Sequence, residues 1–202
     1  MSITIINYGL GNLRSVQKAL ERLGIRTKIS SDLNEISSAE KLLLPGVGHF
    51  KKGMKNIITL GLLGILNEKV LKEKVPILGI CLGMQLMTKF SEEGNVEGFG
   101  WIDAETKKFI LEKKHKIPHM GWNNIDIIKK NGFTKNISEK DFFYFVHSFY
   151  VTSVKEEDLL FKTEYGQEFV SGFNKDNIYG VQFHPEKSHD AGLQLLKNFS
   201  EL

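Results

Sequence analysis

The sequence is short of cysteine and of long apolar runs. One cysteine among 202 residues allows neither an internal disulfide nor a thiolate metal cluster, which is typical of a protein from a reducing compartment. No run approaches the roughly 20 apolar residues that a membrane helix needs, and the N-terminus resembles no secretory signal. These absences predict a cytoplasmic protein that makes no use of a membrane. They leave Cys81 as either a buried structural thiol or a nucleophile.

An excess of charge of one sign is also lacking. The 27 Lys and Arg residues against 24 Asp and Glu leave a formal net charge of +3. The one dense basic stretch, residues 113–116, has no interleaved aromatic residues that could stack on bases. We therefore expect a solvent-exposed loop there and no binding of nucleic acid. Hydrophobic residues make up 41% of the chain, which is ordinary for a globular protein, and the length suits one domain over residues 1–202.

Short apolar runs alternate with amphipathic stretches in the N-terminal half, and glycine or proline closes each run. This alternation is typical of βαβ units in a parallel sheet. We expect strands at residues 3–6, 42–44 and 76–80, and a helix that begins near Leu13. Two of these strands run into glycine loops, and ligands bind outside the C-terminal ends of parallel strands. The two loops are therefore candidates for one site.

The C-terminal half, from about Trp101, has shorter alternating runs that are typical of mixed or antiparallel sheet. The strands are expected at residues 124–128, 142–146, 168–173 and 177–183, and a closing helix at 191–199. The predicted fold class is α/β, with a central mixed and mostly parallel sheet flanked by helices.

A glycine-flanked cysteine stands where a strand gives way to a helix. Residues 79–83 read Gly-Ile-Cys-Leu-Gly, and a helix is expected from near Met84. This is the context of a nucleophile elbow with sulfur in place of oxygen. We expect a strained backbone at the cysteine, with glycines where side chains would collide with neighbouring backbone. The dipole of the following helix favours a thiolate. The context therefore favours a nucleophile over a structural thiol.

A thiolate nucleophile needs a proton shuttle, and six histidines are candidates. Only His184 stands at the end of a predicted strand with a carboxylate, Glu186, two residues further on. Residues i and i+2 of a strand point to the same side, so Glu186 can hold one ring nitrogen while the other faces the sulfur. The alternative is a strand-end histidine with an incidental ion pair. His119 and His147 are expected to be buried polar groups with hydrogen-bond partners.

Acyl chemistry also needs donors for a developing oxyanion. The backbone N–H of Leu82, at the start of the helix, is one candidate, and the N–H of Val47 in the glycine loop at residues 45–48 is the second. A phosphate-binding loop is the alternative for residues 45–48. It is disfavoured because no Lys-Ser/Thr pair or third glycine follows at the expected spacing.

Six separate motifs, in order along essentially the whole chain, resemble those of the class I, or triad-type, glutamine amidotransferases. They lie at residues 7–13, 44–48, 79–85, 118–123, 145–148 and 182–188. The resemblance implies a flavodoxin-like fold and attack of Cys81 on the side-chain amide of L-glutamine. It also implies that His184, oriented by Glu186, protonates the departing ammonia before the thioester is hydrolysed.

The same resemblance implies the residues that bind glutamine. Gln85 and Glu93 match positions that hold the head group of the substrate in similar enzymes, and Gly48 lines the same pocket. Ser148 and its neighbour Phe149 match backbone contacts to the substrate carboxylate. No His/Cys/Asp cluster has the spacing of a metal site, so neither a metal nor an organic cofactor is expected.

Within the family, the chain most resembles glutaminase subunits that pass ammonia to a cyclase in histidine biosynthesis, as one half of a heterodimer. Asn12, Trp122, Tyr144 and Lys187 match the face that meets this partner. Without the resemblance, the two aromatic residues would be interpreted as core residues and Asn12 as a turn residue or helix cap.

Two departures from the family pattern leave other interpretations open. Phe149 stands where the family usually has tyrosine, although Tyr150 follows, and His189 with Asp190 are unusual for the histidine-pathway subunit. They resemble residues of amidotransferases whose partners modify surface sugars, so a partner that amidates a sialic-acid-like precursor is the alternative. A noncatalytic regulatory module and a cysteine peptidase of similar architecture are further alternatives.

Overall fold

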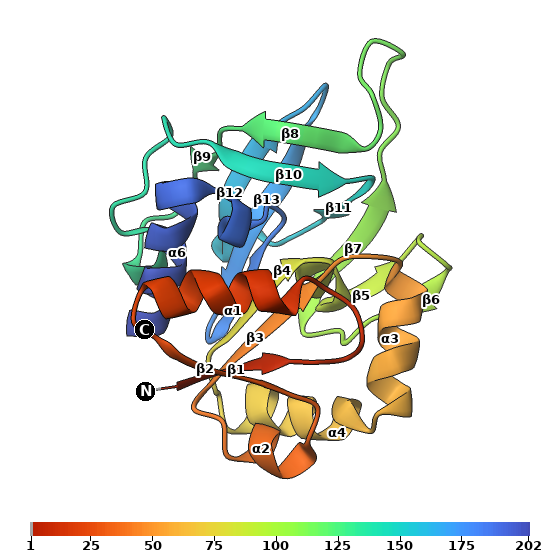
Figure 1. Ribbon diagram of the computed structural model, residues 1–202. Helices are drawn as coiled ribbons and strands as arrows, with labels where there is room; N and C mark the ends of the chain where they lie inside the picture. The colour runs from red at the N-terminus through yellow and green to blue at the C-terminus, as the bar shows by residue number, and fades with distance from the viewer. Residues whose placement is uncertain (1) are drawn as a thin grey trace.

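Five parallel strands form the centre of the computed structural model, which describes residues 2–202 (Figure 1). In spatial order they are β2 (Arg26–Ser30), β1 (Ser2–Ile6), β3 (Lys41–Gly46), β4 (Ile77–Cys81) and β14 (Ile178–Val181). Every residue of β3 and β4 is buried, as expected for parallel strands that are covered on both faces. The strands predicted in the N-terminal half are therefore confirmed.

The sheet continues beyond β14 with mainly antiparallel strands. The further strands are β13 (Glu168–Lys175), β11 (Phe149–Thr152), β7 (Ile102–Lys108), β5 (Thr88–Ser91) and β6 (Val96–Glu97), while β12 (Leu159–Glu164) pairs with β13 and with β9 (Asp126–Ile127). Only the β5–β7 pair is parallel in this half. The expected mixed sheet, parallel first and antiparallel towards the C-terminus, is confirmed.

Helices cover both faces of the parallel strands (Figure 1). They are α1 (Leu13–Arg22), α2 (Leu33–Ser37), α3 (Phe50–Thr59), α4 (Leu62–Asn67), α5 (Leu82–Leu86) and α6 (His189–Glu201), with the π-helix η1 (Glu68–Lys72) and the 3₁₀ turns η2 (Gly132–Thr134), η3 (Glu156–Asp158) and η4 (Pro185–Lys187). Ile3 and Ile5 pack with α1 and α6, whereas Ile6 packs with α2, α3 and α4. This split follows from the two-residue period of a strand. No helix within residues 2–202 has the length and apolar character to cross a bilayer.

A separate two-stranded sheet, β8 (His119–Asn123) with β10 (Phe143–His147), lies above the main sheet (Figure 1). The strand predicted at residues 124–128 is confirmed only in part, because pairing within that range is limited to the short β9 and the β8–β10 pairing already stops at Asn123. Ile125 is fully buried without belonging to a strand. The apolar alternation there reports burial and not strand pairing.

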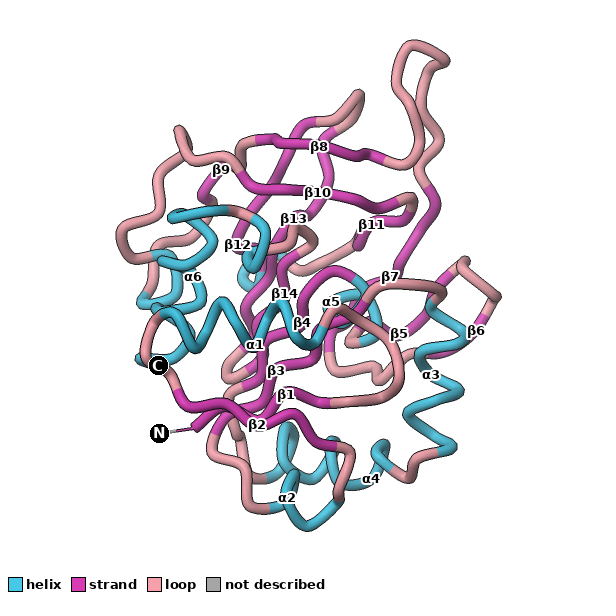
Figure 2. The backbone as a smooth tube through the Cα atoms, viewed as in Figure 1, coloured by secondary structure: helices cyan, strands magenta, loops and turns pink. Residues whose placement is uncertain are grey.

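A long loop connects β7 to β8 and projects from the body of the molecule (Figure 2). Lys113, Lys114 and Lys116 within it are exposed, and His115 packs against Tyr165. The expected solvent-exposed basic loop is confirmed.

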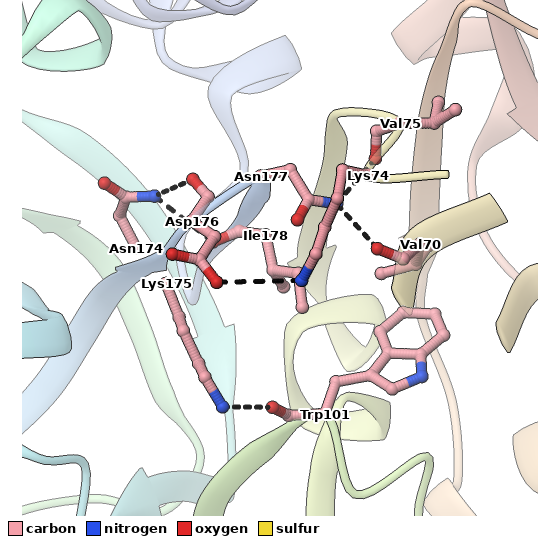
Figure 3. Close-up of polar contacts among 9 residues, drawn as sticks. All are labelled: Val70, Lys74, Val75, Trp101, Asn174, Lys175, Asp176, Asn177 and Ile178. Atoms are coloured by element: carbon pink, nitrogen blue, oxygen red, sulfur yellow. Dashed lines mark hydrogen bonds and ion pairs between the residues drawn. The ribbon is translucent and has the colours of Figure 1, made fainter. Parts of the chain in front are cut away.

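Polar contacts tie down the end of the sheet that lies opposite the ends of β3 and β4 (Figure 3). The side-chain amide of Asn177 donates to the carbonyls of Val70, at 3.0 Å, and Val75, at 2.8 Å. Lys175 Nζ donates to the carbonyl of Trp101 at 3.2 Å. Because Asn177 precedes β14 and Val75 precedes β4, these bonds fix where both strands begin.

Candidate active site

The turn between β4 and α5 holds Cys81 in a strained conformation. Its φ is 53° and its ψ is −109°, a combination that residues other than glycine rarely adopt. A Cβ atom at Gly79 would lie 2.7 Å from the backbone nitrogen of Met84, and one at Gly83 would overlap the carbonyl oxygen of Leu44. The predicted elbow and the need for both glycines are therefore confirmed. The helix begins at residue 82, earlier than expected, and spans only five residues.

A cavity of about 300 Å³ opens beside Cys81, which is one of its lining residues. All the residues expected to bind substrate or oxyanion line it: Val47, Gly48, Leu82, Gln85, Glu93, Ser148 and Phe149. They come from the ends of β3 and β4, the segment after β5, and the connection between β10 and β11. The two glycine loops therefore meet at one site, as expected for the C-terminal edge of a parallel sheet.

His184 lies at the end of the segment that follows β14, and Glu186 lies in η4. Nδ1 of His184 is 2.8 Å from Oε1 of Glu186, and both side chains are 2% exposed. The backbone N–H of His184 donates to the carbonyl of Tyr144 at 2.8 Å, which ties this segment to β10. A carboxylate can only accept, so Nδ1 carries a proton and Nε2 is the nitrogen available for chemistry. Within residues 2–202, Nε2 has no hydrogen-bond partner.

Opposing effects act on the charge of His184. Burial would lower the pKa of its imidazole, but the neighbouring sulfur of Cys81 and the carboxylate of Glu186 favour the protonated ring, outweigh burial and raise that pKa to about 10. The ring is therefore held as an imidazolium at neutral pH, beside the sulfur and the carboxylate. This arrangement can supply a proton to a leaving group.

Gln182 is a residue of this site for which the sequence pattern predicts no role. It is fully buried, and its Nε2 lies 3.6 Å from Sγ of Cys81. Its Oε1 accepts from Nε2 of Gln85 at 2.9 Å, and the same Gln85 nitrogen donates to the carbonyl of Phe149 at 3.0 Å. The available signal was the two-residue period, because Gln182 precedes His184 by two positions and shares its side of the extended segment.

Glu93 has one carboxylate oxygen engaged in the protein. Oε2 accepts from the backbone N–H of Phe50 at 2.7 Å, at the start of α3, where a negative charge is favourable. Oε1 has no hydrogen bond within the described chain, and Glu93 lines the cavity. Among residues 2–202, no three His, Cys, Asp or Glu side chains form a group that could hold a metal ion.

The departure at position 149 leaves the polar contacts of this segment in place. Phe149 contributes its backbone carbonyl, which accepts from Gln85 at 3.0 Å and lies 2.8 Å from Nδ1 of His147. Neither contact depends on a side-chain hydroxyl. Tyr150 does not replace the missing hydroxyl, because its ring stacks on Phe109 in the core at 4.6 Å.

The four residues expected at a partner face are partly brought together. Trp122 packs edge-on against Tyr144 at 5.8 Å, and Nζ of Lys187 lies 5.4 Å from the centre of the Tyr144 ring. His189 stacks on Trp122 at 4.9 Å with the two rings parallel. Trp122 is 47% exposed, so the interpretation as a core residue is wrong for it, because one face of the β8–β10 sheet is uncovered. We call Trp122, Tyr144, Lys187 and His189 the aromatic cluster.

Asn12 is exposed and immediately precedes α1. Its side chain makes no capping hydrogen bond to that helix. Asn12 therefore occupies the N-cap position, as one of its two interpretations expected, but its side chain does not cap the helix.

The family model of class I glutamine amidotransferases matches residues 4–201, nearly the whole chain. The chain belongs to the class I glutamine amidotransferases. Two solved structures support the fold alone: a glutamine amidotransferase with a TM-score of 0.76 and 17% identity, covering 98% of this chain and 97% of the other, and PurLQS from Thermotoga maritima with a TM-score of 0.75 and 17% identity, covering 99% and 97%.

Curated relatives place this amidotransferase more narrowly. It is 53% identical over 197 residues to imidazole glycerol phosphate synthase subunit HisH 2 of Methanococcus maripaludis, covering 98% of both chains. It is 50% identical to subunit HisH 1 of Campylobacter jejuni, covering 99% of this chain and 100% of the relative, and 44% identical to HisH 2 of Pseudomonas aeruginosa, covering 99% of both. Among class I amidotransferases, the chain therefore groups with the HisH subunits.

Proposed function

We propose that this amidotransferase hydrolyses L-glutamine to glutamate and ammonia through a thioester on Cys81. One observation carries the proposal. Cys81, in a strained elbow, lines the same cavity as every residue expected to contact the substrate, and the hydrogen-bonded pair of His184 and Glu186 is buried. The thiolate attacks the side-chain amide carbon of glutamine. His184 gives a proton from Nε2 to the departing ammonia and then helps water to attack the thioester, while Glu186 keeps the ring oriented.

The cavity suits a free amino acid, because about 300 Å³ is at the small end of ligand sites. Both hydrogens of the Gln85 amide nitrogen are used by protein acceptors, so its oxygen is left for a donor on the substrate. We assign Gln85 and Glu93 to the head group of glutamine, with Gly48 as a lining residue. The backbone of Ser148 and Phe149 binds the substrate carboxylate.

We assign the oxyanion to the backbone N–H groups of Leu82 and Val47. The N–H of Val47 belongs to the peptide that joins Gly46 to Val47. The glycine at position 46 lowers the steric barrier to turning that peptide, and Val47 is 39% exposed. Losing one such donor typically costs about 100- to 1000-fold in turnover. We therefore expect a slow glutaminase when the chain is alone and a faster one when a partner fixes the Val47 peptide. Equal rates for the isolated chain and the assembled complex would exclude this gating.

We further propose that the partner is the cyclase of imidazole glycerol phosphate synthase and that the two chains form a heterodimer. The names of the relatives support this partner, and the exposed aromatic cluster with Asn12 supports a docking face. Ammonia released in water at neutral pH would mostly become ammonium and lose its nucleophilic lone pair. A direct path to the partner through this face avoids that loss.

A specific observation keeps the sugar-amidating partner as the second candidate. His189, one of the two residues that depart from the histidine-pathway pattern, stacks on Trp122 in the middle of the aromatic cluster. The departure therefore lies on the docking face and not at the site of glutamine hydrolysis. It bears on the identity of the partner and leaves the glutaminase chemistry unchanged.

The test of the glutaminase is replacement of Cys81 by Ala or Ser. Both variants should fold and should release no glutamate from glutamine, because the sulfur is the sole nucleophile. Circular dichroism shows whether the variants fold, and a glutamate-release assay shows whether they hydrolyse glutamine. Turnover by a folded Cys81→Ala protein would falsify the assignment, and peptide cleavage by a wild-type chain that leaves glutamine intact would favour the peptidase.

A further inference from the structure

We propose that Gln182 is a catalytic residue: its side-chain N–H donates a hydrogen bond to the sulfur of Cys81 and stabilises the thiolate, while its oxygen fixes the orientation of Gln85. This inference rests on the proposed role of Cys81 as nucleophile. It adds a second polar group beside the sulfur, on a residue outside the Cys-His-Glu triad.

The orientation of the Gln182 amide follows from a backbone group. The carbonyl of Phe149 can only accept, so the atom of Gln85 that lies 3.0 Å from it must be the nitrogen. The second hydrogen of that nitrogen is directed at Gln182, 2.9 Å away, so the atom of Gln182 facing it must be the oxygen. The nitrogen of Gln182 is then the atom 3.6 Å from Sγ of Cys81.

The contacts of the sulfur favour the ionised form. As a thiol, Cys81 finds one acceptor, the carbonyl of Val146, at 4.0 Å, the limit for a hydrogen bond to sulfur. As a thiolate, it accepts from Gln182 at 3.6 Å. Gln182 is fully buried, and a hydrogen bond to a charged group is stronger where water is excluded. In the proposed reaction His184 takes the proton that the sulfur loses, so the amide of Gln182 and the imidazolium would then act on the same thiolate.

Gln182 also connects the nucleophile to the substrate pocket. Its oxygen leaves the amide of Gln85 only one orientation, with the Gln85 oxygen turned away from the protein acceptors. Two separable effects follow. Loss of the oxygen should weaken glutamine binding through Gln85, and loss of the N–H should lower the thiolate population.

Two variants separate these effects. Gln182→Met has nearly the same length but neither donates nor accepts, so we expect KM for glutamine to rise and kcat to fall about ten- to a hundredfold, the usual range for a hydrogen bond to a charged group. Gln182→Glu keeps an oxygen for Gln85 but places a negative charge towards the sulfur. We expect its KM to stay within about twofold of wild type while kcat falls about tenfold or more.

The rate at which iodoacetamide alkylates Cys81 reports the fraction of the sulfur that is ionised, and the assay needs neither glutamine nor a partner. In Gln182→Met the rate at pH 7 should fall about tenfold, whereas the rate at a pH high enough to ionise any thiol should match wild type. Gln194→Met, the same replacement in α6 at a side chain that hydrogen-bonds to Asn198, is the control and should leave both rates unchanged. A purely structural role for Gln182 would lower stability without this dependence on pH.

The outcomes separate this inference from the proposed function. Wild-type alkylation at pH 7 by a folded Gln182→Met protein that still hydrolyses glutamine would overturn the role of Gln182 alone. A wild-type chain that hydrolyses no glutamine, yet shows the Gln182-dependent alkylation, would overturn the proposed function alone. If the variants do not fold, NMR of wild type decides: the side-chain amide signals of Gln182 should shift as Cys81 ionises, and signals that do not respond would exclude the hydrogen bond.

Discussion

Nδ1 of His119 lies 3.0 Å from Nε2 of His147, and both side chains are buried. Nδ1 of His147 is 2.8 Å from the carbonyl of Phe149, so it must donate there and Nε2 must accept. Nδ1 of His119 is then the donor of the pair. Its own Nε2 is left to accept from the amide of Asn123 at 3.5 Å. Both rings are therefore neutral with the proton on Nδ1, and the expectation of partnered buried histidines is confirmed.

The histidine pair ends on a carbonyl that the active site also uses. Phe149 accepts from His147 on one side and from Gln85 on the other. The chain of donors from Asn123 through His119 and His147 thus holds the segment that lines the substrate cavity. We infer that the pair positions this segment and takes no part in proton transfer.

His147→Phe should therefore raise KM for glutamine while leaving kcat nearly unchanged. The aromatic side chains around His147 can accommodate phenylalanine, but the carbonyl of Phe149 loses a donor and the N–H of His119 loses its acceptor. We expect KM to rise about fivefold or more and the free energy of unfolding to fall by about 1 to 3 kcal/mol. Steady-state kinetics and urea unfolding measure the two effects. His115→Phe, in the loop between β7 and β8, is the control, and an unchanged KM in His147→Phe would contradict the positioning role.

The same two histidines should make the protein less stable in mild acid. Burial lowers the pKa of His119 to about 4, and burial, partly offset by the hydrogen bond to Phe149, lowers the pKa of His147 to about 3. The unfolded chain takes up both protons near pH 6.5, so stability is fully present above that pH. It is lost as the pH falls towards the folded-state values, by up to about 2.7 kcal/mol per pH unit.

The contribution of His184 to stability changes with pH in the opposite direction and mainly at higher pH. Its raised pKa means that its contribution is fully present below pH 6.5 and is lost only as the pH rises towards about 10. Urea unfolding between pH 6 and pH 5, where His184 contributes almost no slope, should therefore isolate the pair. The slope should be absent from the double variant His119→Phe/His147→Phe, and a wild-type stability that is flat over this range would refute the assignment.

The strain at Cys81 predicts an unusual order of stability between two inactive variants. Cys81→Ala keeps a Cβ atom at a φ of 53° and a ψ of −109°, whereas Cys81→Gly removes it. Such conformations cost of order 1 to 3 kcal/mol for residues other than glycine, against roughly 0.5 to 1 kcal/mol for ordering a glycine. We expect Cys81→Gly to be the more stable by about 1 kcal/mol in thermal or urea unfolding. The reverse order would show that the elbow stores no strain.

What the sequence could predict was local. The strands that end in glycine loops, the elbow, and the pair of His184 with Glu186 all depend on residues within a few positions of one another. The structure places them as expected, because buried parallel strands and tight turns impose strong local patterns. The strand predicted at residues 124–128 shows the limit, since only Asp126–Ile127 of it is paired and an apolar alternation cannot distinguish a paired strand from a buried loop.

What the sequence could not predict depends on distant partners. Gln182 meets Gln85 and Cys81 across 97 and 101 positions of the chain. The two-residue period places Gln182 on the same side as His184, but it does not identify these two distant partners. The exposure of Trp122 has the same cause. It depends on which elements cover the β8–β10 sheet, and aromatic residues are more often buried than exposed.

The identity of the partner can be decided by the aromatic cluster. We expect this chain to form a heterodimer with the cyclase from the same organism, and the glutaminase rate to rise when the nucleotide substrate of the cyclase or an analogue is added, because the two sites are coupled. Trp122→Ala should weaken the complex about tenfold or more, as removal of an aromatic anchor commonly does. Ile58→Ala, an exposed apolar residue on α3, is the matched control and should leave the affinity unchanged.

The alternative partner is tested by a binding titration of the same chain against a synthetase that amidates a sugar acid. Stable binding and activation there, with no cyclase binding at tens of micromolar, would overturn the histidine-pathway partner. The variant His189→Ala provides a further distinction between the two candidate partners. If His189 only supports the ring of Trp122, its loss should weaken either complex less than Trp122→Ala does, because the larger indole surface remains. If His189 contacts a sugar-amidating partner directly, its loss should weaken that complex at least as much as loss of the indole.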